Sequence, residues 1–368
     1  MASPTVTTIV TVLRSSQYLR GILDNLMDDP YKGKEVIVVV DEPTEEMKEL
    51  STGYPQIKFL FNAKRIGKVN AINQALKEAH GELLLFLDSD LMLENGNIIT
   101  IVAEQMGEND ILDFKKDIIH SSIISRMVSF DYLGANISAY MFSNFLKKTI
   151  ALDGAAFAIR RESFERIGGF RKVISEDFDL GTRAYLSNLK YKLVDEMRIK
   201  VQAPDALKAW YEQRKRWGIG TGYWLKSNAR TILKVVYREP QVVLPSLFFI
   251  MPSLLLMSLN YFFPKDIYLS LTAFVLLIFA SYFTLELRPI FLVLIGVSAT
   301  WWLLMAAITF LIVSAIYYAM ARKLGLKFNV ADFLLYYFAY SPISLSMFVL
   351  GFLLAISGYK TSKLDWLV

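Results

Sequence analysis

The chain has 368 residues, of which 54% are hydrophobic and 20% are charged, and its formal net charge is +5. This balance is too apolar for an ordinary soluble domain and too charged for a protein that lies wholly within a membrane. The chain has no cysteine and two histidines, His80 and His120, which excludes a disulfide framework or a thiolate metal site and argues against a zinc site built from histidine.

Strand-like and helix-like segments alternate through the first part of the chain. Apolar, β-branched runs predict the strands, and apolar residues spaced at three and four positions predict the helices. Such alternation implies right-handed βαβ units and a mainly parallel sheet, in which ligands bind beyond the C-terminal ends of the strands. The predicted strands are 5–13, 35–40, 57–61 and 82–87, and the predicted helices are 17–27, 44–50 and 67–79.

The next part of the chain alternates less regularly. Residues 118–127 and 132–145 have the spacing of amphipathic helices, and residues 151–160 and 191–194 resemble further strands. Residues 204–234 begin with Pro-Asp, a helix start signal, and are rich in Trp, Tyr, Lys and Arg. That mixture is typical of a helix lying in the headgroup layer of a membrane.

The last third of the chain is almost uncharged. Its apolar runs at about 242–263, 267–285, 290–320 and 333–357 approach or exceed the roughly 20 residues that cross a bilayer. Four spans would return the tail to the side of the catalytic domain, although Arg322, Lys323 and Lys327 would then lie outside, against the positive-inside tendency. Pro245 and Pro252 in the first run leave a re-entrant segment open.

These patterns predict four regions: a soluble domain at 1–203, an interfacial segment at 204–240, about four transmembrane helices at 241–358, and a tail at 359–368. Basic residues cluster at 160–161, 214–216 and 226–234, beside the apolar region, and form no long stripe. We therefore expect a lipid bilayer as a partner and no nucleic acid. No signal peptide is expected, because the chain opens directly as a strand pattern.

Two carboxylates flank a serine directly after a predicted strand. Asp88 and Asp90 stand two positions apart in a turn, where both can face one hard cation such as Mg²⁺ or Mn²⁺, with substrate phosphates as further ligands. The metal would then neutralise a departing diphosphate. An isolated Asp-x-Asp is more often a polar turn that ends a strand, so this pair alone decides little.

Asp41 and Lys68 are candidates for the donor side of a site. Asp41 ends the predicted strand 35–40, where an acidic residue can accept hydrogen bonds from a ribose or a base. Lys68 stands at a predicted helix start, where backbone N–H groups already attract anions, and could contact a phosphate or the nucleoside. A turn residue before Pro43 and a solvated surface charge are the competing interpretations.

Glu176 and Asp177 form an acidic pair at a predicted helix start. Inverting sugar transfer needs one base near the acceptor hydroxyl, and Asp177 is the candidate. The alternative is that Ser175 caps this helix and that Glu176, Asp177 and Asp179 are ordinary first-turn acids, which the helix dipole favours.

Gln213, Arg216 and Trp217 fall on one side of the predicted helix 204–234, because they are three and four positions apart. Arginine can bind a diphosphate with two parallel hydrogen bonds, and tryptophan offers an apolar surface for a sugar ring. An aromatic and basic membrane anchor would use the same residues, and both roles could coexist.

In this order, the segments resemble the membrane-bound family 2 glycosyltransferases, which include cellulose, chitin and hyaluronan synthases. The resemblance covers about residues 5–220, and each segment alone is a weak match. It rests on Asp41, on Gly67-Lys68, on Asp88-Ser89-Asp90, on residues 154–157 with Arg160-Arg161 and Gly168-Gly169-Phe170, on Glu176-Asp177, and on Gln213-x-x-Arg216-Trp217.

The resemblance implies a GT-A catalytic domain, Rossmann-like and α/β, followed by transmembrane helices. It also implies a nucleotide-sugar donor, usually UDP-linked, a divalent Mg²⁺ or Mn²⁺, and inversion at the anomeric carbon. By the same resemblance, Asp177 matches the base and Asp90 the metal ligand, with Asp88 and Asp41 near the nucleotide. The other matches are Lys68, Gln213 and Arg216 at the donor, and Gly154, Glu176 and Trp217 at the acceptor.

Two departures from the family pattern keep alternatives open. First, Asp41 is followed by Glu-Pro-Thr, where many relatives have a second Asp. Second, the chain has fewer predicted spans than long-polymer synthases, which argues against processive secretion. The expected enzyme is a multi-pass plasma-membrane protein with a cytoplasmic catalytic domain, able to self-associate, that extends a polysaccharide. The alternatives are transfer of one sugar to a lipid, such as a polyprenyl phosphate or a glycolipid, and a non-catalytic scaffold or transporter.

Overall fold

The computed structural model describes residues 3–94, 96–262, 271, 273–276, 278 and 287–359. The chain divides into two compact units, one made of Met1–Ser246 and Ser346–Val368 and the other of Leu247–Leu345. Every candidate site residue named above falls within the first unit. The predicted boundaries at residues 203 and 240 stay predictions.

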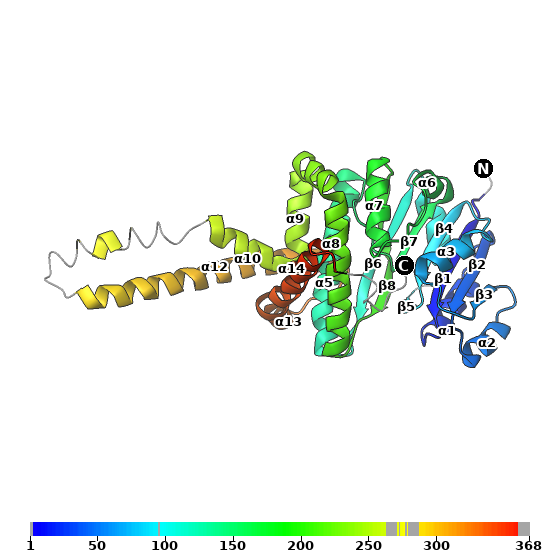
Figure 1. Ribbon diagram of the computed structural model, residues 1–368, viewed down its shortest axis with the longest axis horizontal. Helices are drawn as coiled ribbons and strands as arrows, with labels where there is room; N and C mark the ends of the chain where they lie inside the picture. The colour runs from blue at the N-terminus through cyan, green and yellow to red at the C-terminus, as the bar shows by residue number, and fades with distance from the viewer. Residues whose placement is uncertain are drawn as a thin grey trace. The chain divides into compact units, whose positions relative to one another are not determined.

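Among the described residues, the first unit is built on an eight-stranded sheet with the order β3-β2-β1-β4-β7-β6-β8-β5 (Figure 1). Its most buried strands are largely apolar in their central residues, as expected for a sheet covered on both faces. The strands are β1 Val6–Leu13, β2 Lys34–Asp41, β3 Lys58–Asn62, β4 Leu83–Asp88, β5 Leu91–Leu93, β6 Ile111–Ile119, β7 Ala156–Arg160 and β8 Tyr191–Gln202.

The sheet is mixed, and the predicted parallel arrangement holds from β3 to β4 and again for the pair of β6 with β8. β1 is parallel to its neighbours β2 and β4, and β2 is parallel to β3, as the βαβ pattern predicts. β7 then runs antiparallel to both β4 and β6, and β5 runs antiparallel to β8. The prediction was wrong there because strand direction depends on which distant strands become neighbours, and the local pattern does not encode that choice.

The helices of the first unit begin where the sequence offers caps. Thr44 accepts a hydrogen bond from the backbone N–H of Met47, and Ser122 forms a capping box with Ser125. They are α1 Leu19–Asp28, α2 Glu45–Thr52, α3 Lys68–Leu76, α4 Ile98–Met106, α5 Ile123–Met141, the π-helical turn η1 Phe142–Leu146, α6 Arg161–Arg166, α7 Glu176–Leu186 and α8 Leu207–Arg238.

Several predicted bounds in the middle of the chain were wrong. Ile118 belongs to β6, and the two helices predicted at 118–127 and 132–145 form one helix, α5, that begins only after the Ser122 cap and continues into η1. The strand predicted at 151–160 begins at Ala156, because residues 151–155 form a loop. β8 extends well beyond the predicted 191–194, and α4 and β6 were not predicted.

Helix α8 packs closely on other elements of the first unit at glycine positions. A Cβ on Gly218 would lie 2.8 Å from the backbone oxygen of Met347, and one on Gly351 would lie 2.2 Å from the carbonyl carbon of Gly218. Residues 346–356 of α14 (Ser341–Ile356) therefore approach α8 backbone to backbone, which larger side chains would prevent. On another side, a Cβ on Gly220 would lie 2.5 Å from Ser175 Oγ, so α8 also contacts the segment that enters α7.

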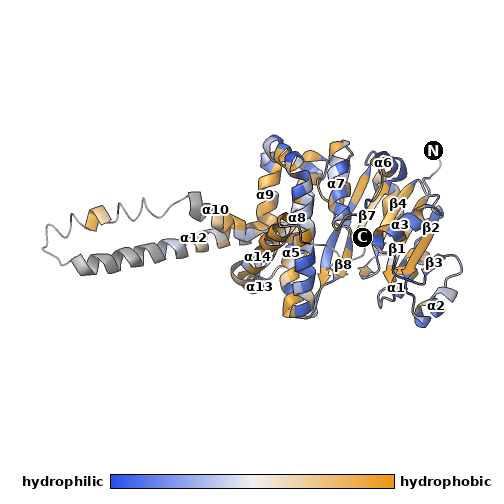
Figure 2. Cartoon of the chain, viewed as in Figure 1, coloured by the Kyte–Doolittle hydropathy of each residue, from blue (hydrophilic) through white to orange (hydrophobic). Residues whose placement is uncertain are grey.

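Apolar helices follow α8, and hydrophobic residues dominate α9, α10 and α14 (Figure 2). Thr300–Lys323 and Val330–Ile356 are each long and apolar enough to cross a membrane, and Pro240–Ile250 with Pro252–Ser258 would add a third span if this pair, bent by 110°, counts as one. Most of the run predicted at 267–285, and the tail after residue 359, lie outside the described residues. The helices are α9 Pro240–Ile250, α10 Pro252–Phe262, α12 Leu287–Lys323, α13 Val330–Leu335, η2 Tyr336–Tyr340 and α14.

Below the carboxyl edge of the sheet, an aromatic cluster joins β4, β7 and α6. The ring of Phe86 lies 5.1 Å from that of Phe157, 5.6 Å from that of Phe164 and 5.3 Å from that of Phe170, centroid to centroid. All four side chains are buried. Rings in edge-to-face and tilted contact resist displacement. The cluster therefore gives the polar residues at the carboxyl edge of the sheet a rigid support.

Candidate active site

Asp41 binds the loop that precedes α3. Its Oδ2 accepts hydrogen bonds from the backbone N–H groups of Ile66 (2.9 Å) and Gly67 (3.0 Å), and its Oδ1 accepts one from Asn62 Nδ2 (3.0 Å). Gly67 has φ 89°, a left-handed conformation that favours glycine. Asp41 lies at the carboxyl edge as predicted, and the contacts it makes hold the turn that delivers Lys68.

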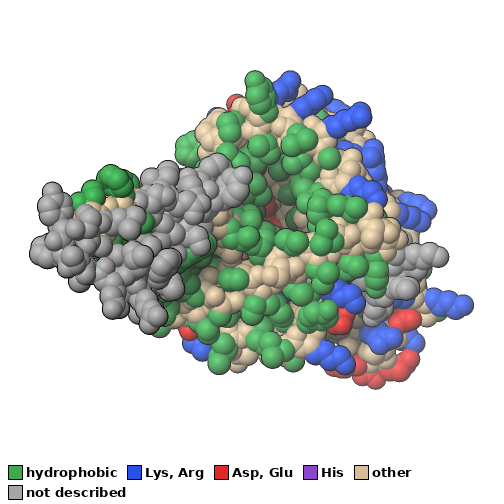
Figure 3. All heavy atoms as spheres, turned by 60° about the vertical axis from the view of Figure 1, so that its left-hand side comes forward, with side chains coloured by type: hydrophobic (Ala, Val, Ile, Leu, Met, Phe, Trp, Pro, Cys, Tyr) green, Lys and Arg blue, Asp and Glu red, His purple; other side chains and the backbone are tan. Residues whose placement is uncertain are grey.

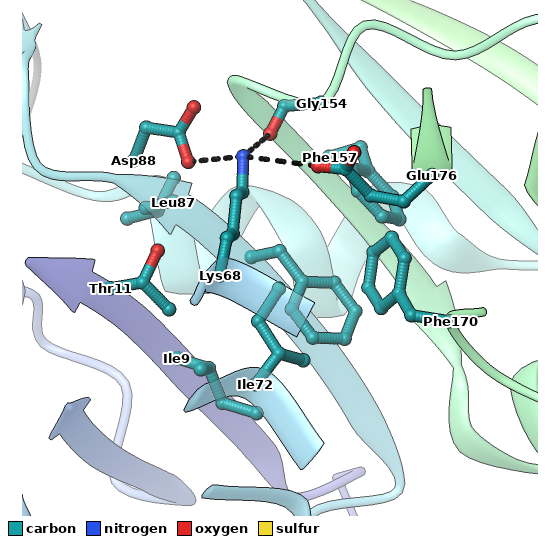
Figure 4. Close-up of a pocket in the computed structure, with 11 residues that line it drawn as sticks. Ile9, Thr11, Lys68, Ile72, Leu87, Asp88, Gly154, Phe157, Phe170 and Glu176 are labelled. Carbon is teal, nitrogen blue, oxygen red and sulfur yellow. Dashed lines mark hydrogen bonds and ion pairs between the residues drawn. The ribbon is translucent and has the colours of Figure 1, made fainter. Parts of the chain in front are cut away.

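Lys68 lies at the centre of the site. Its Nζ is 2.6 Å from Asp88 Oδ1 and 3.9 Å from Glu176 Oε1, and it donates a hydrogen bond to the backbone oxygen of Gly154 (3.2 Å) (Figure 4). These partners come from β4, from α7 and from the loop before β7. The pocket around them is lined below by Ile9, Ile72, Phe157 and Phe170, among others.

Asp177 is fixed on the opposite side of Gly154. Its Oδ2 accepts a hydrogen bond from the backbone N–H of Gly154 (3.1 Å), and its Oδ1 accepts one from that of Phe178 (2.8 Å). A Cβ on Gly154 would lie 3.0 Å from Asp177 Oδ2, so this approach requires a glycine. Ser175 precedes α7 but makes no side-chain capping bond, which corrects the capping alternative.

The two acids at the start of α7 are harder to ionise than ordinary carboxyls. Burial, together with the neighbouring negative charge of Glu176, raises the pKa of Asp177 to about 7, although Lys68 opposes the shift. Burial also raises the pKa of Glu176, again against Lys68. Burial alone would lower the pKa of Lys68, but Asp88 and Glu176 outweigh it and raise that pKa. A buried carboxyl that titrates near neutrality suits a general base.

Asp88 and Asp90 lie together after β4, but their surroundings differ. Asp88 has the ion pair with Lys68, whereas the Asp90 carboxylate has no ion pair among the described residues. Burial and the negative charge of Asp88 raise the pKa of Asp90 to about 6. In the part of the chain that the structure describes, Asp90 thus has no ion-pair partner of its own, and a divalent cation bound there would compensate its charge.

Helix α8 brings Arg216 to this site, and Gln213 lies one turn earlier on the same helix. Burial lowers the pKa of Arg216, and the carboxylates of Glu176, Asp88 and Asp90 are close enough to oppose that shift. Gln213 Oε1 is buried and has no hydrogen-bond partner among the described residues. A buried acceptor without a partner costs free energy, so it is a candidate contact for a bound ligand.

Arg214 is part of the same cluster, although helical spacing separates it from Arg216. It is 2% exposed, its Nη2 is 2.7 Å from Asp131 Oδ2 of α5, and its guanidinium carbon lies 4.7 Å from the centre of the Trp217 ring. Arg214 therefore fixes the ring of Trp217 and cannot serve as an unaffected control. Helical spacing places Arg214 and Arg216 on different faces of α8. The face that carries Arg214 is covered by α5, so Arg214 is buried.

Conservative changes on α8 separate a binding role from a membrane anchor. Arg216→Lys and Trp217→Phe keep a cation and an aromatic ring, so an anchor would tolerate them. We expect each to lower sugar transfer by about 10-fold or more, since the bidentate fork and the indole surface are lost. The matched control is Arg230→Lys, an exposed arginine of the same helix. Equal transfer rates in Arg216→Lys and Arg230→Lys membranes would contradict the binding role.

Sequence reasoning missed the residues on the other side of the site. Asp153 precedes Gly154, and its Oδ2 lies 3.8 Å from Lys116 Nζ, a fully buried lysine of β6 that forms an ion pair with Asp113. Tyr132 of α5 has its pKa raised by burial and then by Asp153 and Asp90, which places its phenol beside them. The alternation Asp113 to Lys116 in an otherwise apolar stretch was the only signal available, and it was read as irregular sequence.

Comparison with known proteins shows what the chain is similar to. The family described as Glycosyl transferase family 2 matches residues 7–168. The matched region contains β1 to β4, Asp41, Lys68, Asp88, Asp90 and the loop with Gly154. It ends before α7 and α8.

Relatives among curated proteins are distant. The probable glycosyltransferase YdaM of Bacillus subtilis is 26% identical over 207 residues, which cover 51% of this chain and 48% of that protein. Poly-beta-1,6-N-acetyl-D-glucosamine synthase of Staphylococcus epidermidis is 20% identical over 229 residues, covering 58% of this chain and 53% of that protein. The chain spans about half the length of the curated relatives it matches.

A solved structure shares the fold over nearly the whole chain. The mannosyltransferase PcManGT from Pyrobaculum calidifontis, in complex with GDP-Man and Mn²⁺, covers 98% of this chain and 89% of its own, with a TM-score of 0.56 and 15% sequence identity. At that identity the likeness concerns the fold, which is the mixed, Rossmann-like sheet of GT-A proteins. Residues 7–168 thus resemble family 2 glycosyltransferases, the curated relatives are glycosyltransferases or sugar-polymer synthases, and the fold is shared with a mannosyltransferase.

Proposed function

We propose that this protein is an inverting glycosyltransferase that moves a sugar from a nucleotide-diphosphate sugar, of the UDP type, to a growing polysaccharide at a membrane. The observation that carries the proposal is the loop of residues 153–155. Its Gly154 contacts both Lys68 and Asp177, and the Ala155 oxygen accepts a hydrogen bond from the backbone N–H of Asp88 (2.8 Å). This loop thus contacts Lys68 and Asp88, which we assign to the donor side, and Asp177, which we assign as the base.

In the proposed reaction, the acceptor hydroxyl gives its proton to Asp177 as its oxygen bonds to the anomeric carbon of the donor sugar. The bond from that carbon to the diphosphate oxygen breaks, and a nucleoside diphosphate leaves. Lys68 and Arg216 lie where positive charge stabilises the departing diphosphate. Asp41 holds the turn that carries Lys68, Gln213 offers a buried acceptor to the donor, and Glu176 keeps Lys68 and Arg216 in place through their charges.

A divalent cation fits the residues present. In the parts of the chain that the structure describes, no three His, Cys, Asp or Glu side chains form a metal cluster. Mg²⁺ and Mn²⁺ need fewer protein ligands, because one or two carboxylates and substrate phosphates complete the shell. Asp90, with Asp88 beside it, would hold the cation through oxygen atoms alone. Such a cation, when bound, supplies positive charge to the diphosphate.

Metal dependence gives a direct expectation. Transfer and donor hydrolysis should stop in excess chelator and return with Mg²⁺ or Mn²⁺. Asp90→Asn should lose more activity than Asp88→Asn, because Asp88 is already neutralised by Lys68 and Asp90 has the raised pKa of an uncompensated acid. Activity can be followed as nucleoside diphosphate released per minute. Full activity in chelator, or the reverse order of the two variants, would refute the assignment.

Membrane attachment is supported by the apolar helices and by the surface of α8. Its side chains Leu207, Leu233 and Tyr237 are 71%, 68% and 88% exposed. Hydrophobic side chains gather on the face in Figure 3, with Lys and Arg along its upper right margin. Exposed apolar and basic groups together favour the surface of an anionic bilayer. We propose a multi-pass plasma-membrane protein whose catalytic unit is cytoplasmic.

Labelled donors test the proposed function. Membranes containing the protein are incubated with UDP-glucose, UDP-GlcNAc and GDP-mannose, and released nucleoside diphosphate and the fate of the label are measured. We expect one donor to release nucleoside diphosphate and to leave label in material that organic solvent does not extract. Label in the lipid extract would favour transfer to a lipid. No release from any donor would contradict a glycosyltransferase.

A further inference from the structure

The far side of the candidate active site is built around a buried lysine. Lys116 of β6 is 3% exposed and forms an ion pair with Asp113, whose Oδ2 also accepts a hydrogen bond from Tyr191 Oη (3.0 Å). Asn136 of α5 binds the Lys116 backbone twice, accepting from its N–H (3.1 Å) and donating to its oxygen (2.6 Å). Burying ions is costly, and here Asp113 pairs with the ammonium group, Tyr191 orients Asp113, and Asn136 holds the backbone that carries Lys116.

That ammonium group points to Asp153. Lys116 Nζ lies 3.8 Å from Asp153 Oδ2, while Asp153 Oδ1 accepts a hydrogen bond from the backbone N–H of Ala155 (3.0 Å). The Asp153 side chain is 36% exposed, unlike Lys116 and Asp113. Lys116 and the Ala155 N–H therefore orient the two oxygens of Asp153. The remaining lone pairs of these oxygens are available to accept hydrogen bonds on the exposed side.

Asp153 adjoins the reacting groups through its chain neighbour Gly154. The N–H of Gly154 donates to Asp177 Oδ2 (3.1 Å), and its oxygen accepts from Lys68 Nζ (3.2 Å). The negative charge of Asp153 also acts on Tyr132, which in turn lies close enough to Arg214 to be affected by its charge. Asp153 is thus a partly exposed carboxylate directly beside the glycine that contacts both Lys68 and Asp177.

We propose that Asp153, oriented by Lys116, binds hydroxyl groups of a neutral sugar acceptor and excludes an acceptor that carries a phosphate. A carboxylate accepts hydrogen bonds from sugar hydroxyls, and the phenol of Tyr132 adds an aromatic surface and a further hydroxyl. A phosphate monoester in the same place would meet the negative charges of Asp153 and Asp177, because Lys116, the cation behind Asp153, is already paired with Asp113. Lys68 and Arg216 serve the donor diphosphate.

This inference rests on the proposed function and narrows it. Of the acceptors left open by the sequence, it selects the hydroxyl of a glycan or neutral glycolipid over a polyprenyl phosphate. Asp153 would touch the acceptor, whereas Lys116 acts through Asp153 and is a positioning residue. The bonds formed and broken in the transfer are those already given, with the sugar hydroxyl as the group that loses its proton to Asp177.

The test compares acceptors with the full chain in membranes or detergent. The probes are the donor found above, methyl glycosides and short oligosaccharides of glucose, mannose and N-acetylglucosamine, and undecaprenyl phosphate. We expect the wild type to transfer to a neutral sugar in preference to undecaprenyl phosphate. Asp153→Asn should raise KM for the sugar acceptor by about 10-fold or more, the scale of a lost charge-assisted hydrogen bond, and lower the ratio of transfer to donor hydrolysis.

Lys116→Met should raise the same KM, and the double variant should be no worse than Asp153→Asn, because the two residues act as one unit. Lys115→Met is the matched control: Lys115 is a neighbouring buried lysine that donates to the backbone oxygen of Asp195, away from the site. It should keep the wild-type acceptor KM. Asp153 is partly exposed, so Asp153→Asn gives an answer even if Lys116→Met fails to fold.

Three results would overturn the inference while leaving the proposed function intact. They are preferential transfer to undecaprenyl phosphate, an unchanged sugar KM in Asp153→Asn, and equal effects of Lys115→Met and Lys116→Met on that KM. Failure of the wild type to release nucleoside diphosphate from any donor is a different result. It would overturn the proposed function, and this inference with it.

Discussion

Asp177→Asn should reduce the turnover of sugar transfer by about 10²-fold or more while donor affinity stays near that of the wild type. Asparagine retains an oxygen to accept the Gly154 N–H, so the loop of residues 153–155 should keep its place. What it loses is the ability to take a proton from the acceptor. Turnover is measured as nucleoside diphosphate released at saturating acceptor, and donor affinity by isothermal titration.

Asp179→Asn is the matched control for the base. Asp179 also lies in the first turn of α7, where it forms an ion pair with Arg183 (2.7 Å). If the acids of this turn act only through the helix dipole, both variants should behave alike. We expect Asp179→Asn to change turnover little, so similar losses in the two variants would reject Asp177 as the base.

The pH dependence has a definite sign. Because the pKa of Asp177 is raised to about 7, its carboxylate is depleted as pH falls below that value. Turnover should therefore rise with pH and reach a plateau above about 7, falling by about tenfold per unit on the acid side. The acid limb should be absent from the residual activity of Asp177→Asn.

Lys68→Met should abolish most activity, by about 10²-fold or more, because one cation joins three parts of the site. Its removal leaves Asp88 and Glu176 facing each other without the positive charge that both contact. The same change should lower the free energy of unfolding by about 2 kcal/mol, a value reduced from that of a fully buried pair because both Lys68 and Asp88 are partly exposed. Thermal or denaturant unfolding and nucleoside diphosphate release measure the two effects.

A control variant and a charge-conserving variant test this expectation. Lys77→Met removes an exposed lysine at the end of the same helix and should leave both quantities near wild type. Lys68→Arg keeps the charge in a larger, planar group and should restore stability more than turnover. Normal turnover in Lys68→Met would mean that the ion pairs around Lys68 are structural only.

The parts of the fold that the sequence revealed are those with local signals. Continuous apolar runs marked β1, β2 and β4, and the residues that end them, Asp41 and Asp88, lie at the carboxyl edge as expected. The order of strands beyond β4 depends on pairing between segments more than sixty residues apart, such as β4 with β7. No local periodicity carries that information, so the mixed half of the sheet was missed.

The same distinction explains the candidate site. Asp88, Glu176 and Asp177 could be named from short motifs, because acids at strand ends and helix starts are local features. The joining role of Gly154 and the pair of Lys116 with Asp153 required three-dimensional structure, since their partners come from different elements. Arg214 shows the limit of helical spacing: spacing separates it from Arg216, but its ion pair with Asp131 of α5 holds it beside Trp217.

The anomeric configuration of the transferred sugar tests the central claim most directly. If Asp177 is the base of a single displacement, the acceptor oxygen attacks from the face opposite the leaving diphosphate. A sugar that is α-linked in the donor should therefore be β-linked in the first product, as read from the coupling constant of its anomeric proton by NMR. A product with the α configuration of the donor would contradict an inverting transfer and the role assigned to Asp177.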